Sequence, residues 1–78
     1  MSLLEKYNEV FITNLKVTEG ELAVLTYQSV PAWDSVGHMG LITALEEAFD
    51  IMIDTDDIID FSSYEIGKGI LKKYNVNL

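Results

Sequence analysis

Two long segments of the chain repeat apolar residues every three or four positions, which is the spacing of an amphipathic helix. The first covers residues 3–14 and begins with a capping-box pattern, Ser2 followed by Glu5. The second covers residues 35–50, and Asp34 directly before it is a good N-cap. Its inward face consists of His38, Leu41, Ile42, Leu45, Ala48 and Phe49. The pattern therefore predicts two well-defined helices.

The nineteen residues from Leu15 to Trp33 show neither a helical nor a strand period. A connection of this length is unusual in a small domain and indicates either a functional loop or one that packs on itself. Its apolar residues are expected to hold it across the helices. A short helical turn at residues 19–24 remains open.

Two shorter helices are predicted in the last third of the chain. Asp54 or Thr55 can cap a short third helix, and Ser62 with Glu65 forms a second capping-box pattern before a fourth. The expected fold class is therefore all-α. We predict a small bundle of four helices, right-angled to antiparallel, with a long loop between the first two, a short third helix and no sheet.

The predicted core combines apolar positions from all four helices. It consists of Leu4, Phe11, Leu41, Leu45, Phe49, Ile53, Ile58, Tyr64 and Ile70. Two glycines, Gly67 and Gly69, weaken the fourth helix by about 1 kcal/mol each relative to alanine. The presence of glycine at these two positions would be explained if helices cross closely there.

The length and the net charge of the chain limit the kinds of partner that it can bind. Residues 1–78 are expected to form one small domain. The sequence has thirteen acidic residues, five lysines and no arginine, which gives a net charge of −8. Nucleic acids and anionic membranes would be repelled, whereas basic proteins would be attracted. Nine of the acidic residues lie between Asp34 and Glu65, a stretch without lysine, so this surface is expected to steer basic enzymes.

Several other classes of protein are disfavoured. The sequence has no cysteine, no apolar run of membrane-spanning length and no signal-peptide pattern, so we expect a soluble cytoplasmic protein. A calcium loop at residues 54–60 is disfavoured because Ile58 stands where an oxygen ligand is needed, and the single histidine disfavours zinc. No metal site is predicted. No catalytic residues are predicted either, because no serine, histidine and aspartate form a set with a credible base.

Ser35 has the most distinctive setting in the sequence. It falls at the first helical position after the Asp34 cap, at the positive end of the helix dipole. Pro31 lies just upstream, where it can end an extended segment without costing the helix a hydrogen bond. An exposed hydroxyl in this position is well placed to hold a phosphate group.

Residues 34–49 resemble the acyl carrier protein family. The resemblance rests on the pair Asp34-Ser35, on the spacing of Leu41 and Leu45, and on the sequence ALEEAF at residues 44–49. It implies that Ser35 carries a 4′-phosphopantetheine arm derived from coenzyme A. The thiol of that arm would hold an acyl group as a thioester. The chain would then be a non-catalytic carrier and a substrate of a phosphopantetheinyl transferase.

By the same resemblance, the outward face of this helix docks partner enzymes. These would be the transferase and acyl-activating, acyltransferase or synthase enzymes with basic docking patches, acting on a monomeric carrier. The face consists of Val36, Met39, Gly40, Thr43, Glu46 and Glu47, with Asp34 beside the modified serine. Because Val36, Gly40 and Thr43 depart from the pattern of fatty-acid carriers, we expect a specialised biosynthetic pathway.

Other interpretations remain open at this point. Asp34 could be only a helix cap in an unmodified acidic adaptor that binds a basic protein partner. Trp33 could pack over the end of the second helix, which we favour, or it could contact the arm or a partner. His38 is expected to be neutral and partly buried, since a cation would be disfavoured near the positive end of the helix.

Overall fold

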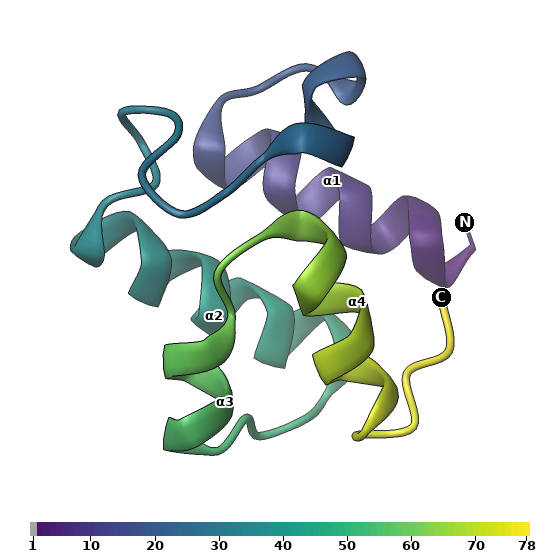
Figure 1. Cartoon of the computed structure of the whole chain (residues 1–78). Helices are drawn as coiled ribbons and strands as arrows, with labels where there is room; N and C mark the ends of the chain where they lie inside the picture. The colour runs from purple at the N-terminus through teal and green to yellow at the C-terminus, as the bar shows by residue number, and fades with distance from the viewer. Residues whose placement is uncertain (1) are drawn as a thin grey trace.

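The predicted all-α class is confirmed by the computed structural model, which describes residues 2–78. Within these residues there are four α-helices, one 3-10 helix and no strand. Their bounds are α1 Leu3–Leu15, η1 Glu19–Val24, α2 Ser35–Phe49, α3 Thr55–Asp60 and α4 Tyr64–Lys72. Figure 1 shows α1 above α2, with α4 in front of them and α3 below α2.

Local capping explains where the two long helices begin and end. The predicted capping box is present at α1, where Ser2 Oγ accepts from the amide of Glu5 and the Glu5 carboxylate accepts from the amide of Ser2. α1 ends where Lys16 adopts a left-handed backbone with φ of 57°. Asp34 caps α2, which ends where Asp50 has φ of 53°. The predicted bounds of both helices are confirmed to within one residue.

The start of α4 corrects one prediction. Its N-cap is Ser63, whose hydroxyl accepts from the amide of Ile66 at 3.0 Å. The predicted capping box of Ser62 and Glu65 is therefore wrong: the cap lies one residue later, and Ile66 at the third helical position has no side-chain acceptor to complete a box. Two adjacent serines offer the same local chemistry, and the position of the helix decides which of them becomes the cap.

The long connection between α1 and α2 packs onto the helices, as predicted, and η1 forms the helical turn left open at residues 19–24. Its buried side chains are Val17, Leu22, Leu25 and Trp33. Two backbone hydrogen bonds tie the connection to the start of α4. The amide of Tyr27 donates to the Ser62 carbonyl at 2.8 Å, and the amide of Tyr64 donates to the Leu25 carbonyl at 3.1 Å.

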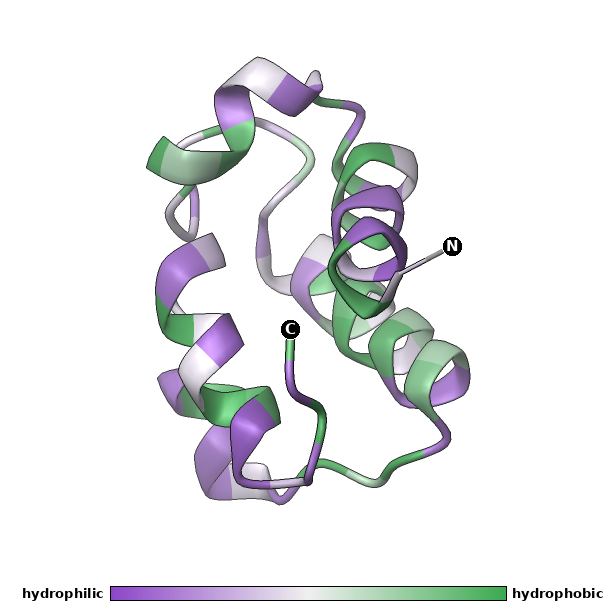
Figure 2. Cartoon of the chain, turned by 90° about the vertical axis from the view of Figure 1, so that its right-hand side faces the viewer, coloured by the Kyte–Doolittle hydropathy of each residue, from purple (hydrophilic) through white to green (hydrophobic). Residues whose placement is uncertain are grey.

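A cluster of aromatic rings forms the centre of the core. Its members are Tyr7, Phe11, Trp33, Phe61 and Tyr64. The Phe11 ring centre lies 4.8 Å from that of Tyr7 and 5.7 Å from that of Trp33, in the tilted and edge-on arrangements that aromatic pairs favour. Figure 2 shows hydrophobic and hydrophilic residues alternating along the helices that surround this cluster.

Most of the predicted core is confirmed. The buried members are Phe11, Leu41, Leu45, Ile53, Tyr64 and Ile70. Phe49 and Ile58 are half-buried and pack at its edge. The prediction that Leu4 belongs to the core is wrong, since the exposed fraction of this residue is 38%. It shares a helical face with the buried Tyr7, but it belongs to the first turn of α1, which the rest of the chain leaves partly uncovered.

The two glycines of α4 have different surroundings. A Cβ atom on Gly67 would overlap the Tyr7 hydroxyl and the Phe61 ring, so the glycine is explained by two packed aromatic side chains and not by a close crossing of helices. A Cβ atom on Gly69 would meet open space, so the prediction of a close helix crossing at this position is wrong. The Tyr7 hydroxyl donates to the Tyr64 carbonyl at 2.7 Å, and burial raises the pKa of Tyr7 well above its usual range.

Candidate functional site

Ser35 is exposed at the first position of α2, as predicted. Asp34 precedes it, also exposed, and its Oδ1 atom accepts from the amide of Gly37 at 2.7 Å. This bond satisfies one of the free amides in the first turn of the helix. Because α2 is 15 residues long, its amino end carries the partial positive charge of a full helix dipole next to the Ser35 hydroxyl.

Gly37 is a site residue that sequence reasoning missed. A Cβ atom at this position would overlap the backbone carbonyl of Ala32. The segment before α2 can therefore fold back tightly against the first turn only because residue 37 has no side chain. The Gly37 amide also bonds to Asp34, so this residue helps to fix the backbone on both sides of Ser35. The only hint in the sequence was a glycine two residues after Ser35.

Trp33 is fully buried and packs over the amino-terminal end of α2, against His38. This confirms the favoured interpretation, in which the ring packs over an end of the second helix. Its indole Nε1–H donates to Nδ1 of His38 at 2.9 Å. An indole nitrogen can only donate, so Nδ1 must accept and the imidazole proton is assigned to Nε2. Nε2 then donates to the carbonyl of Ile58 at 2.8 Å. His38 is half-buried, as predicted, and it links the connection before α2 to α3.

A largely apolar hollow of about 360 Å³ opens beside Ser35, between α2 and α3. Besides Ser35, its walls include Tyr27, His38, Met39, Ile58, Ile59 and Phe61. Its size is within the range of small-ligand pockets, which are mostly apolar with a few polar groups. The residues come from three separate parts of the chain, so the sequence pattern could not predict the hollow.

The predicted docking face is mostly open to solvent. Val36 is 80% exposed and Met39 51% exposed, and Gly40, Thr43 and Glu47 are exposed as well. Glu46 differs from these residues. It is half-buried, and its Oε2 atom accepts from the amide of Ile53 at 2.9 Å, so it helps to hold the segment that follows α2.

The structure adds an apolar residue and two carboxylates next to this face. Ile59 on α3 is 72% exposed and borders the same hollow as Met39. Asp56 and Asp60, also on α3, are exposed. Exposed apolar side chains next to carboxylates have the composition of an interface centre with a polar rim.

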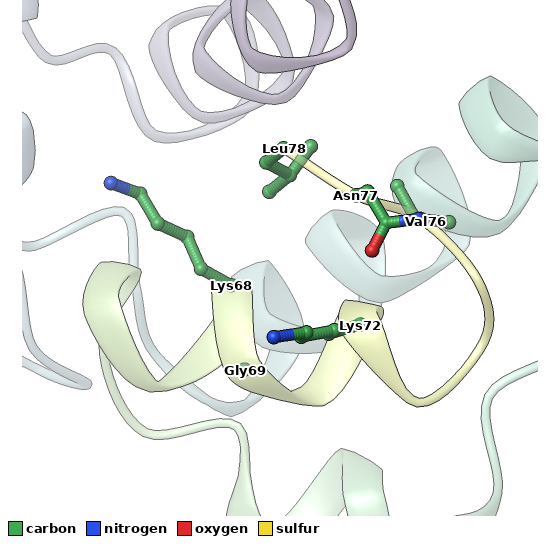
Figure 3. Close-up of a pocket in the computed structure, with 6 residues that line it drawn as sticks. All are labelled: Lys68, Gly69, Lys72, Val76, Asn77 and Leu78. Carbon is green, nitrogen blue, oxygen red and sulfur yellow. The ribbon is translucent and has the colours of Figure 1, made fainter.

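A second hollow, of about 390 Å³, lies between α4 and the C-terminal segment, and Figure 3 shows its walls. They consist of Lys68, Gly69, Lys72, Val76, Asn77 and Leu78. None of these residues borders the hollow beside Ser35. The two hollows are therefore separate features with different charge.

The aspartates of residues 54–60 do not gather around a common point. In residues 2–78 there is no group of three histidine, cysteine or acidic side chains that could hold a metal ion. Asp57 instead bonds to Lys73 and to the Tyr74 hydroxyl. No helix in the described part of the chain is both long and apolar enough to cross a membrane.

Comparisons with known proteins do not assign a family. No protein-family model, no curated protein and no solved structure matches the chain significantly. The function is therefore inferred from Ser35 and its surroundings, namely an exposed hydroxyl at a helix start, an apolar hollow beside it and an acidic exposed face next to both.

Proposed function

We propose that this chain is an acyl carrier, in which Ser35 holds a 4′-phosphopantetheine arm and presents an acyl group to partner enzymes. The observation that carries the proposal is the exposed Ser35 at the first turn of α2, directly beside an apolar hollow. The arm supplies the thiol that holds the cargo as a thioester. The chain supplies the hydroxyl, its placement and a surface for recognition.

The modification needs only the Ser35 hydroxyl from this chain. A transferase joins Ser35 Oγ to the phosphorus that bears the pantetheine, while the bond from that phosphorus to the adenosine phosphate breaks. The hydroxyl proton passes to a base of the transferase. The resulting phosphodiester is an anion at the amino end of α2, where the free amides and the helix dipole stabilise negative charge.

Recognition by partners is proposed to use the exposed face beside Ser35. Val36, Met39 and Ile59 provide apolar contacts, and the flexible side chain of Met39 can adapt to several partners. Carboxylates such as Glu47 speed the encounter with basic patches on the transferase and on acyl-activating, acyltransferase or synthase enzymes. A specialised biosynthetic pathway remains the proposed setting.

The test of this function is the intact mass of the protein after incubation with coenzyme A, magnesium and a broad-specificity phosphopantetheinyl transferase. The wild-type chain should gain one phosphopantetheine group, and Ser35→Ala should gain none. Ser62→Ala is the matched control, because Ser62 is exposed and borders the same hollow, and this variant should be modified normally. A wild-type chain without the added mass would instead favour an unmodified acidic adaptor.

A second prediction concerns the docking face. Glu47→Lys should slow modification about two- to fivefold at low salt, because an exposed charge at an interface rim contributes modestly and mainly to the encounter rate. The difference should shrink at high salt, where charges are screened. Initial rates of mass gain measure it. Glu46 is unsuitable for this test because its carboxylate also holds the Ile53 amide.

Glu9→Lys provides the control for Glu47→Lys. Glu9 is exposed on α1, so the substitution changes the net charge by the same amount away from the proposed face. It should leave the rate near that of the wild type. Equal slowing by both variants would mean that net charge, and not this face of α2, governs recognition.

A further inference from the structure

The lysines of this acidic chain are unevenly placed. Three of the five, Lys68, Lys72 and Lys73, lie close together at the end of α4. Lys73 bonds to Asp57, and the Lys68 ammonium lies 3.5 Å from the Glu65 carboxylate. Lys72 is exposed and takes part in neither of the two ion pairs found in residues 2–78. Its positive charge is therefore available to another molecule.

Lys68 and Lys72 both border the hollow of about 390 Å³ between α4 and the C-terminal segment. They are four residues apart, so they lie on the same face of the helix. Figure 3 shows their side chains on one side of this space and Leu78 on the other. The helix wall is open at Gly69, where even a Cβ atom would have no neighbour within 4 Å. With Val76 at its far wall, the hollow combines apolar surface with a positive edge.

Another hollow, of about 360 Å³, lies on the other side of the C-terminal segment. Figure 1 shows this segment running from the end of α4 toward the start of α1. Val76 is 6% exposed and borders both hollows. The other walls come from the start of α1, the end of α2 and the turn after α4, and they consist of Leu3, Lys6, Ala48, Phe49, Asp50 and Asn75. We call the surface formed by these two hollows the basic end.

The side chains of the basic end carry an excess of positive charge. They include three lysines and one carboxylate, namely Lys6, Lys68, Lys72 and Asp50. The Lys6 ammonium donates to the Ala48 carbonyl at 3.0 Å, which holds its charge at the rim. Carboxylates further away than the Debye length, about 8 Å at physiological salt, are largely screened. The net charge of −8 therefore does not prevent local attraction of an anion.

The carboxyl end of α4 opposes an anion less than a free helix end would. Unpaired carbonyls give such an end its partial negative charge. Here the carbonyls of Ile70, Leu71 and Lys72 all accept hydrogen bonds from the amides of residues 73–76, at 2.9 to 3.1 Å. The two lysines on this helix are thus only partly offset by its dipole.

α2 separates the basic end from Ser35. Phe49 is the last residue of this helix and Ser35 the first, so they are about 21 Å apart along the helix axis. No residue of the basic end borders the hollow beside Ser35. A segment bound at the basic end would therefore leave the serine uncovered.

We propose that the basic end is a docking surface for an acidic segment of a partner protein. Apolar side chains of the segment enter the two hollows, as amphipathic helices do in apolar grooves, and its carboxylates pair with Lys68 and Lys72. A protein segment fits better than a small molecule because Gly69, Lys72 and Asn77 are exposed, so a larger partner is needed to cover the hollow. The proposal does not rest on modification of Ser35.

A designed acidic peptide tests the proposal. The probe is two repeats of Leu-Glu-Glu-Leu-Glu-Glu-Glu with blocked ends, in which the leucines share one face of a helix. Followed by the amide chemical shifts of the unmodified chain, the peptide should perturb the basic end saturably and leave the amides around Ser35 unchanged. The same peptide with glutamine in place of glutamate should bind at least tenfold more weakly. No saturable shift at millimolar peptide, or shifts centred elsewhere, would overturn the proposal.

Gly69→Leu separates docking from stability. The leucine side chain would occupy the hollow, so the affinity for the acidic peptide should fall at least tenfold. Because leucine favours a helix more than glycine does, the variant should melt no lower than the wild type. Gly20→Leu is the matched control, since Gly20 also meets open space but lies in η1, outside the basic end, and it should bind normally. Wild-type affinity in Gly69→Leu would show that the hollow is not used.

Lys72→Gln tests the charge of the basic end. It should weaken binding of the acidic peptide about two- to fivefold at low salt, and the double variant with Lys68→Gln about tenfold. Both differences should shrink at high salt. Lys16→Gln is the matched control, because Lys16 is exposed at the end of α1 and borders neither hollow. Equal weakening by Lys16→Gln would mean that net charge alone governs binding and would overturn the proposed surface.

Discussion

Replacing Trp33 with alanine should destabilise the fold by about 3–5 kcal/mol, the range for removing a buried large aromatic side chain. Trp33 is fully buried, packs edge-on against Phe11 and donates its indole N–H to His38. A protein of this size has a total stability of about 4–12 kcal/mol, so the variant would retain little of it. Urea unfolding followed by circular dichroism measures the loss without needing the indole fluorescence.

Trp33→Phe separates packing from hydrogen bonding. It keeps an aromatic ring against Phe11 but leaves His38 Nδ1 without its donor. The expected cost is about 1–3 kcal/mol, from one unpaired polar atom and a smaller ring. If Trp33→Ala unfolded at the wild-type urea concentration, the indole would not be part of the core and the Trp33–His38–Ile58 link would lose its basis.

Leu45→Ala should cost about 2–5 kcal/mol, because it removes a fully buried side chain from the inward face of α2 and leaves a cavity. This loss also approaches the whole stability of the chain. Thr43→Ala is the matched control on the same helix, since Thr43 is exposed and its replacement should change stability by less than about 0.5 kcal/mol.

The two variants of α2 together test the orientation of that helix. The same thermal or urea unfolding series serves both. If Leu45→Ala melted like the wild type while Thr43→Ala was destabilised, the buried and exposed faces would be exchanged. The docking face proposed here would then point into the core, so the result bears on the function as well as on the fold.

Local interactions explain why the helices could be predicted from the sequence. A capping side chain acts on amides within three residues, and an amphipathic period is recognised within one continuous segment of three or four turns. The start of α1 at Ser2 and of α2 after Asp34 follows from such contacts. The exposure of Ser35, Val36 and Met39 follows as well, because these residues lie outside the inward stripe of one regular helix.

Long-range packing decided the rest, because a local pattern holds no information on which distant segments meet. Leu4 has the right period for the core but lies at an uncovered helix end, and Gly67 meets Tyr7 whereas Gly69 meets open space.

The surroundings of Ser35 depend on distant contacts in the same way. The hollow beside this residue needs α3 next to α2. The link from Trp33 through His38 ends on the Ile58 carbonyl, twenty residues after His38. Asp57 bonds to Lys73 and to Tyr74, which lie sixteen and seventeen residues further along the chain. The sequence alone thus determined the helices and the exposed serine, whereas only the tertiary structure decided what surrounds that serine.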